Sequence, residues 1–146
     1  MGVGIGVDVP DGQFEDPVTF GSLMPGGFSH ETAFSGVCDD WLAELLPYLK
    51  SNRDFMADYL IENFPDLHFT IPNATYLAWL DFSEYVKSGK IEGLPFDFFL
   101  KEAKVAFTEG KPFGEGCENI VRLNFACPRS MLAEGLERMR KAVYKT

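Results

Sequence analysis

Cysteine and histidine are scarce in this 146-residue chain, which has three of the first and two of the second. Cys38, Cys117 and Cys127 are odd in number and lack the paired short spacing of a zinc site. We therefore expect neither a disulfide framework nor a structural metal, and this usage favours a reducing, cytoplasmic environment. The two histidines have no partner at ligand spacing, so a solvated or capping role is the better interpretation.

Basic residues are absent from the first third of the chain. Residues 1–49 hold eight acids and no lysine or arginine, whereas residues 50–146 hold fourteen acids and thirteen bases. A nucleic-acid backbone would be repelled by the first segment and would find no basic stripe in the second, so nucleic-acid binding is not expected. Long apolar runs are also lacking, and no cation precedes an apolar segment at the start. We expect neither a membrane span nor a secretory signal.

The first 30 residues differ in composition from the rest. They contain seven of the fourteen glycines and three of the nine prolines, and they show no helical period. We interpret residues 1–30 as a loop or poorly ordered lead-in and residues 31–146 as one folded domain.

Hydrophobic periodicity outlines the elements of that domain. Apolar residues recur at steps of three and four from Asp39 to about Asn63, which predicts an amphipathic helix closed by Pro65. Pro47 either kinks this helix or lies in the first turn of a second one. A final helix is expected after Ser130, a plausible cap. Its apolar stripe is Leu132, Leu136, Met139 and Val143.

Between these helices the sequence alternates strand and helix signals. We expect strands over 67–71, 75–82 and 119–126, a helix over 95–106, and a glycine-rich loop before the last strand. The order is helix, two strands, helix, strand, helix. It predicts an α+β fold in which a small antiparallel or mixed sheet is covered by helices on one side.

One strand carries an unusual polar face. In "NIVRLNFACPRS", apolar residues alternate on one side while Arg122 and Asn124 fall on the other. Arg122 could pair with a carboxylate such as Asp81 across the sheet. Alternatively, its planar fork could hold the carboxylate of an amino acid through two parallel hydrogen bonds. The residues alone leave both interpretations open.

Four blocks carry a family resemblance: "WLAELLPYLKSNRDF", "TYLAWLDF", "AKVAFTEGKPFG" and "VRLNFACPRSMLAEGLERM". Together they resemble the C-terminal small domain of pyridoxal phosphate (PLP)-dependent class I/II aminotransferases of fold type I. They are most similar to the cystathionine β-lyase, or C–S lyase, branch, and the similarity covers roughly residues 31–146. The chain is thereby placed in amino-acid metabolism.

The resemblance implies roles for individual residues. Arg122 matches the arginine that grips the substrate α-carboxylate, and Asn124 would support it as a second substrate-binding residue. Gly110, Gly114 and Gly116 would border the same cleft. The helix around 41–63 looks like the one that joins the large and small domains, while Arg129 is interpreted as a structural anchor near the start of the last helix.

The resemblance also implies what is missing. PLP enzymes of this type need a lysine for the Schiff base and an acidic partner for the pyridine nitrogen, and the family places both in its large domain. All eight lysines here lie in segments that match the small domain. We therefore expect a fragment or truncated product that has no catalytic residue, binds no PLP alone and is inactive alone. Its exposed apolar surface would take a large domain in trans or a second copy.

Two other interpretations stay open. The chain could be a non-catalytic module that keeps the fold and binds amino acids or a partner protein. It could also be an unrelated acidic α+β domain with a chance resemblance. The small-domain blocks do not separate a lyase from an aminotransferase.

Overall fold

The computed structural model describes residues 3–4 and 35–145. The chain divides into two compact units, one of Met1–Val7 with Leu49–Thr146 and one of Asp8–Tyr48. The predicted lead-in lies outside the described residues except for strand β1 (Val3–Gly4), which pairs in parallel with β4 (Val105–Ala106). The division into a lead-in and a domain at residue 31 stays a prediction.

The first long helix is a single element. Helix α2 (Asp39–Asn63) has 25 residues, begins with two acids that favour a helix N-terminus, and contains Pro47. Of the two alternatives for Pro47, a separate second helix is wrong. The boundaries of 39 and 63 are those expected from the periodicity.

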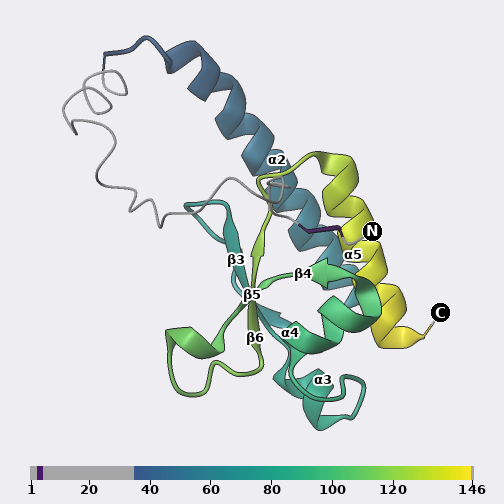
Figure 1. Cartoon of the computed structure of the whole chain (residues 1–146). Helices are drawn as coiled ribbons and strands as arrows, with labels where there is room; N and C mark the ends of the chain where they lie inside the picture. Colours follow the sequence, from purple (N-terminus) through teal and green to yellow (C-terminus); the bar gives the residue numbers. More distant parts are fainter. Residues whose placement is uncertain (1–2, 5–34, 146) are drawn as a thin grey trace, which may run out of the picture. The chain divides into compact units, whose positions relative to one another are not determined.

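A four-stranded antiparallel sheet forms the centre of the larger unit (Figure 1). Its order is β2 (His68–Phe69), β3 (Leu77–Asp81), β6 (Ile120–Asn124) and β5 (Thr108–Glu109). The predicted strands are present but shorter than expected. The two edge strands each have only two residues.

Several short elements differ from the sequence prediction. Helix α3 (Ser83–Lys87) follows β3 directly, and the helix expected over 95–106 is α4 (Pro95–Phe98) with a π-helical turn, η1 (Phe99–Ala103). It ends at Lys104, whose left-handed backbone, with φ of 57°, turns the chain into β4. The glycine-rich loop contains β5 and a 3₁₀ turn, η2 (Lys111–Phe113).

The last helix begins two residues earlier than expected. Helix α5 (Arg129–Tyr144) has Pro128 at its N-cap and no side-chain cap, so Ser130 lies inside the first turn and the predicted cap is wrong. Proline suits this position because its missing N–H is not needed there. The four residues of its predicted apolar stripe are all buried, which confirms the stripe.

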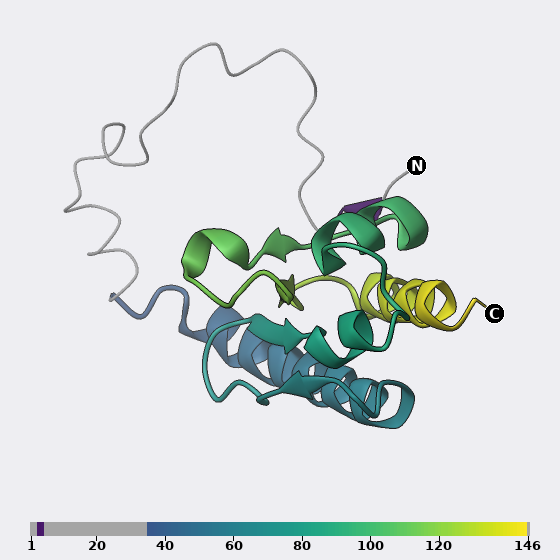
Figure 2. The ribbon, with the colours of Figure 1, turned by 90° about the horizontal axis from the view of Figure 1, so that it is seen from below.

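The hydrophobic core lies on one face of the sheet. Along β3 and β6 the buried residues alternate with half-exposed ones, so Ala78, Leu80, Val121 and Leu123 face the core. Residues of α2 and α5 complete the same core, and Tyr59 of α2 donates a hydrogen bond of 2.7 Å to Glu137 of α5. Both views show these helices beside each other (Figures 1 and 2). The predicted α+β class, with helices on one side of a small antiparallel sheet, is confirmed.

The first half of α2, in the smaller unit, is largely exposed. Trp41, Leu42, Leu46 and Tyr48 have exposed fractions of 65%, 43%, 55% and 43%. We call these four residues the α2 apolar face. In the described part of the chain, no helix combines the length and the apolar character that crossing a membrane requires.

Candidate functional site

Arg122 lies in the middle of an interior strand. Its neighbours Val121 and Leu123 are buried in the core, so strand alternation turns Arg122 to the opposite face of the sheet. Across β3 it is opposite Trp79, and across β5 it is opposite Thr108. Pairing on both sides holds its backbone rigidly.

Two aromatic rings surround the Arg122 guanidinium. Its Cζ atom lies 4.9 Å from the centroid of the Phe113 ring and 5.6 Å from that of Trp79. The two rings are 5.0 Å apart and nearly perpendicular, at 83°. The Nε atom of Arg122 is buried and has no hydrogen-bond partner. Sequence reasoning missed both rings, because neither lies near Arg122 along the chain.

One of the two interpretations of Arg122, a pair with Asp81 across the sheet, is not observed. Asp81 is opposite Ile120 and His68 in the register, and its Oδ1 accepts hydrogen bonds from the N–H and the hydroxyl of Ser83, at 2.9 and 2.6 Å. Among residues 35–145, no ion pair involves Arg122. The pair with Asp81 is therefore absent from the structure, and a role of Arg122 in binding substrate stays a prediction.

Asn124 lies two residues beyond Arg122 on the same face of β6. Its Oδ1 accepts a hydrogen bond of 2.9 Å from the N–H of Ala126. The carbonyl oxygen of the Asn124 side chain thus stabilises the chain segment that follows β6. A role in binding substrate stays a prediction.

The glycine-rich loop reaches Arg122 through Phe113. Gly114 and Gly116 have φ of 152° and 81°, backbone conformations that favour glycine. Gly110 is required for space, because an added Cβ would clash with the carbonyl oxygens of Cys117 and Ile120. The loop therefore lies against β6, but the cleft that it was expected to border stays a prediction.

Arg129 acts as the anchor that the sequence suggested. Its Nε donates to Oδ1 of Asn52 at 2.8 Å, and its Nη2 donates to Ser51 Oγ at 2.7 Å. Its guanidinium also lies over the ring of Phe55, with the Cζ atom 4.5 Å from the ring centroid. Asn52 is fully buried and donates to the carbonyls of Phe125 and Cys127, at 3.0 and 2.8 Å. This arrangement fastens α2 to the segment between β6 and α5.

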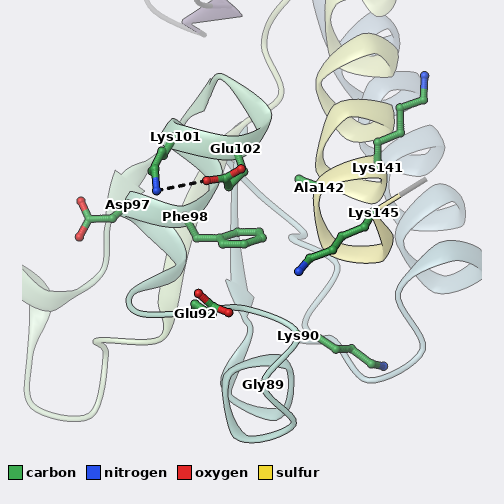
Figure 3. Close-up of a pocket in the computed structure, with 10 residues that line it drawn as sticks. All are labelled: Gly89, Lys90, Glu92, Asp97, Phe98, Lys101, Glu102, Lys141, Ala142 and Lys145. Atoms are coloured by element: carbon green, nitrogen blue, oxygen red, sulfur yellow. Dashed lines mark ion pairs between the residues drawn. The ribbon is translucent and has the colours of Figure 1, made fainter.

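A separate cavity lies between α4, η1 and the end of α5 (Figure 3). Its volume is about 480 Å³, and its lining has four lysines, three acids and the ring of Phe98. Lys101 and Glu102 form an ion pair of 3.4 Å there, while Lys90 pairs with Asp66 at 3.3 Å. Arg122 and Asn124 are not part of this cavity. Its charged groups are of both signs, and all four of its lysines are exposed, so it resembles a solvated surface hollow.

Neither a buried lysine nor a metal-binding cluster is found among the described residues. All eight lysines are exposed: Lys50, Lys87, Lys90, Lys101, Lys104, Lys111, Lys141 and Lys145. The part of the chain that the structure describes contains no cluster of three or more His, Cys, Asp or Glu side chains suited to a metal ion. The candidate site therefore consists of an arginine without an ion-pair partner among the described residues, two aromatic rings and an amide. These residues are Arg122, Phe113, Trp79 and Asn124.

Comparisons with known proteins show similarity in both sequence and fold. No protein-family model matches the chain. Cystathionine β-lyase of Corynebacterium glutamicum is 41% identical over 101 residues, which cover 69% of this chain and 26% of that protein. Cystathionine β-lyase PatB of Bacillus subtilis is 35% identical over 103 residues, covering 70% and 26%.

Solved structures agree with the sequence relatives. The PLP-bound C–S lyase from Staphylococcus hominis is 34% identical with a TM-score of 0.70, and the match covers 75% of this chain and 29% of that one. Cystalysin from Treponema denticola, which contains a pyridoxal 5′-phosphate cofactor, is 29% identical with a TM-score of 0.64, covering 75% and 27%. The chain spans 26–34% of the length of its curated relatives. The homologues of this chain are therefore PLP-dependent cystathionine β-lyases and C–S lyases of fold type I, and the chain matches one part of them.

Proposed function

We propose that residues 31–146 are the small domain of a PLP-dependent C–S lyase and that Arg122 binds the α-carboxylate of its amino-acid substrate. The observation that carries this proposal is the buried, unpartnered Nε of Arg122. A buried N–H without a hydrogen-bond partner is unfavourable, and Arg122 as a whole is half-exposed, so this cation on a rigid strand favours a ligand that accepts hydrogen bonds from the guanidinium. The relatives that cleave cystathionine give the substrate class.

The shape of the guanidinium suits a carboxylate. Its N–H groups lie in one plane and match the two oxygens of a carboxylate through parallel hydrogen bonds. Asp81, which could have taken this role from within the sheet, is held by Ser83 instead. The carboxylate would therefore come from a ligand.

Asn124 is the second proposed substrate-binding residue. Its Oδ1 is used by Ala126, but its Nδ2 can still donate a hydrogen bond. Because Asn124 and Arg122 share one face of β6, a carboxylate held by the arginine would lie within reach of this strand face. The amide would add one neutral hydrogen bond to the charged pair.

The chain's own residues do not fit a complete PLP site. Such a site needs a lysine to carry the cofactor aldehyde and an acid at the pyridine nitrogen, in a pocket sheltered from water. All eight lysines are exposed instead, and several form ion pairs with neighbouring acids on the surface. We propose that the cofactor residues belong to a large domain and that the chain contributes substrate recognition.

Carboxylate binding can be tested on the chain itself. L-alanine would be titrated into the ¹⁵N-labelled protein while the backbone N–H signals of β6 and, where the arginine is present, the Arg122 side-chain N–H signal are followed. L-alaninamide would serve as a ligand that lacks the carboxylate. We expect saturable shifts with L-alanine only. The Arg122→Ala variant should lose them. Arg122→Lys should bind more weakly than the wild type, because an ammonium lacks the planar fork.

A matched control separates this site from general charge effects. Arg138→Ala removes another partly exposed arginine, which pairs with Glu134 on α5. Binding should be unchanged in that variant. Equal shifts with both ligands, or equal binding by wild type and Arg122→Ala, would refute the role of Arg122.

The α2 apolar face favours a second function, docking of a partner domain. Its four residues recur at four- and seven-residue spacings, so they occupy one broad side of the helix. Trp41 alone is 65% exposed. We commit to the large domain of a PLP enzyme as the occupant, because the curated relatives are three to four times the length that the chain matches.

Docking can be measured by sedimentation. The chain would be mixed with the C. glutamicum cystathionine β-lyase from which the matching segment has been deleted. We expect a complex with the wild type, none with Trp41→Asp or Leu46→Asp, and normal docking by Ile61→Asp, a control that changes another exposed apolar residue of α2. Homodimers abolished by Trp41→Asp would assign the face to a second copy instead, and a monomer that binds neither partner would refute docking.

A further inference from the structure

The described contacts of the Arg122 side chain are with two aromatic rings. Phe113 and Trp79 meet at 83° and form a corner, and the guanidinium carbon lies 4.9 and 5.6 Å from the two ring centroids. Attraction between a cation and an aromatic ring acts through the ring face, whereas hydrogen bonds of a guanidinium leave along its in-plane edge. An aromatic ring accepts no strong hydrogen bond, so contact with these two rings leaves the guanidinium donors available.

Support of an arginine by aromatic rings differs from support by a protein carboxylate. A protein carboxylate would also fix an arginine, but it would occupy the same donors that a ligand carboxylate needs. Aromatic rings do not compete in this way. A long side chain that is already immobilised also loses less conformational freedom when a ligand binds.

The loop that carries Phe113 is itself fastened to the strand of Arg122. Gly110 donates its N–H to the Ile120 carbonyl at 3.0 Å, and the Ile120 N–H donates to the Cys117 carbonyl at 3.1 Å. Phe113 closes the 3₁₀ turn with a bond of 2.9 Å from its N–H to the Gly110 carbonyl. Three backbone bonds thus set the position of the Phe113 ring relative to β6.

Trp79 is set by the sheet rather than by a loop. It is directly opposite Arg122 in the antiparallel register of β3 and β6, where facing side chains lie close together. Both rings stay partly open to solvent, with exposed fractions of 41% for Trp79 and 52% for Phe113. Core packing therefore does not account for their placement.

We infer that Phe113 and Trp79 are positioning residues for Arg122, which hold its guanidinium so that the in-plane edge meets the carboxylate of an amino-acid ligand. This inference rests on the proposed carboxylate-binding function. It assigns the glycine-rich loop a specific task, because the loop supplies one of the two rings.

The test uses the L-alanine titration on the whole chain with ring-deleting and ring-keeping variants. Phe113→Leu and Trp79→Leu remove a ring, whereas Phe113→Tyr and Trp79→Phe keep one. We expect each leucine variant to weaken L-alanine binding by roughly 2- to 10-fold, and each ring-keeping variant to restore most of the affinity. The leucine variants should also move the Arg122 side-chain N–H signal before ligand is added, because a ring current is lost.

A double-variant cycle separates positioning from general stability. In an Arg122→Lys background, which is expected to keep weak binding, Phe113→Leu should reduce the affinity less than it does in the wild type, because the planar group that the ring positions is gone. Should Phe113→Leu fail to fold, the Trp79 pair supplies the same comparison. Leucine variants that bind L-alanine as well as the wild type would overturn the inference and leave the carboxylate site intact. A wild type that does not bind L-alanine would overturn both.

Discussion

Trp79 and Arg122 face each other across the antiparallel pair of β3 and β6, with the guanidinium carbon 5.6 Å from the indole ring centroid. An opposed pair of this kind depends on register, since a shift of one residue would turn one partner into the core. The register therefore does two things at once. It buries Leu80 and Val121 on one face and places a cation beside an aromatic ring on the other.

Asn52 should be the most sensitive polar residue for stability. Asn52→Ala removes two hydrogen bonds to the Phe125 and Cys127 carbonyls and one from Arg129, and leaves these groups without that partner. We expect the free energy of unfolding to fall by about 2–4 kcal/mol, measured by urea denaturation. Asn63→Ala is the control, because Asn63 makes one bond, to Tyr59, at a half-buried position of the same helix. A similar loss in both variants would contradict this account.

Glu137 should make stability depend on acid pH. Hydrogen bonds from Arg140 and Tyr59 lower the pKa of its carboxyl from the ordinary 4.5 to about 2. Since the folded-state pKa lies below the unfolded one, the charged group stabilises the fold above about pH 4.5, and this contribution disappears as the pH falls toward 2. Wild type and Glu137→Gln, compared by urea unfolding between these values, should differ most at the upper end. A difference that does not change with pH would exclude this linkage.

Gly135→Ala should stabilise the protein. Gly135 is buried inside α5, and an added Cβ would meet no atom within 4 Å. Alanine restricts the unfolded chain and favours the helix, so the free energy of unfolding should rise by about 0.5–1 kcal/mol in thermal or urea denaturation. A decrease would mean that the space beside α5 is smaller than the structure indicates.

Gly110→Ala should have the opposite effect. Its added methyl group would lie 2.5 Å from the Cys117 carbonyl oxygen, against backbone that cannot move aside easily. We expect a loss of about 1–3 kcal/mol together with a changed Arg122 side-chain N–H signal, since Phe113 would shift with the loop. An unchanged NMR signal in a folded Gly110→Ala protein would show that the loop does not position the ring.

Much of the fold could be predicted because its signals are local. The periodicity from Asp39 to Asn63 reports one helix, and the alternation around Arg122 reports which residues of β6 share a face. A helix repeats every 3.6 residues and a strand every two, so both patterns can be recognised without knowing which other elements pack against them. The fold class followed from the order of these elements.

The surroundings of the site could not be predicted in the same way. Phe113 and Trp79 reach Arg122 only through the register of three strands, and no local pattern reports that register. Asn52 lies in the polar stretch "KSNRD", which suggests a surface, yet contacts 73 and 75 residues away bury it. The π-helical turn η1 likewise interrupts a pattern that indicates one ordinary helix.

The sheet ends on both sides in strands of two residues, β2 and β5. Such short borders present few free backbone groups to another chain, so edge-to-edge growth into amyloid-like ribbons is disfavoured. Any association of this protein at high concentration should therefore involve helix side chains and not the sheet edges.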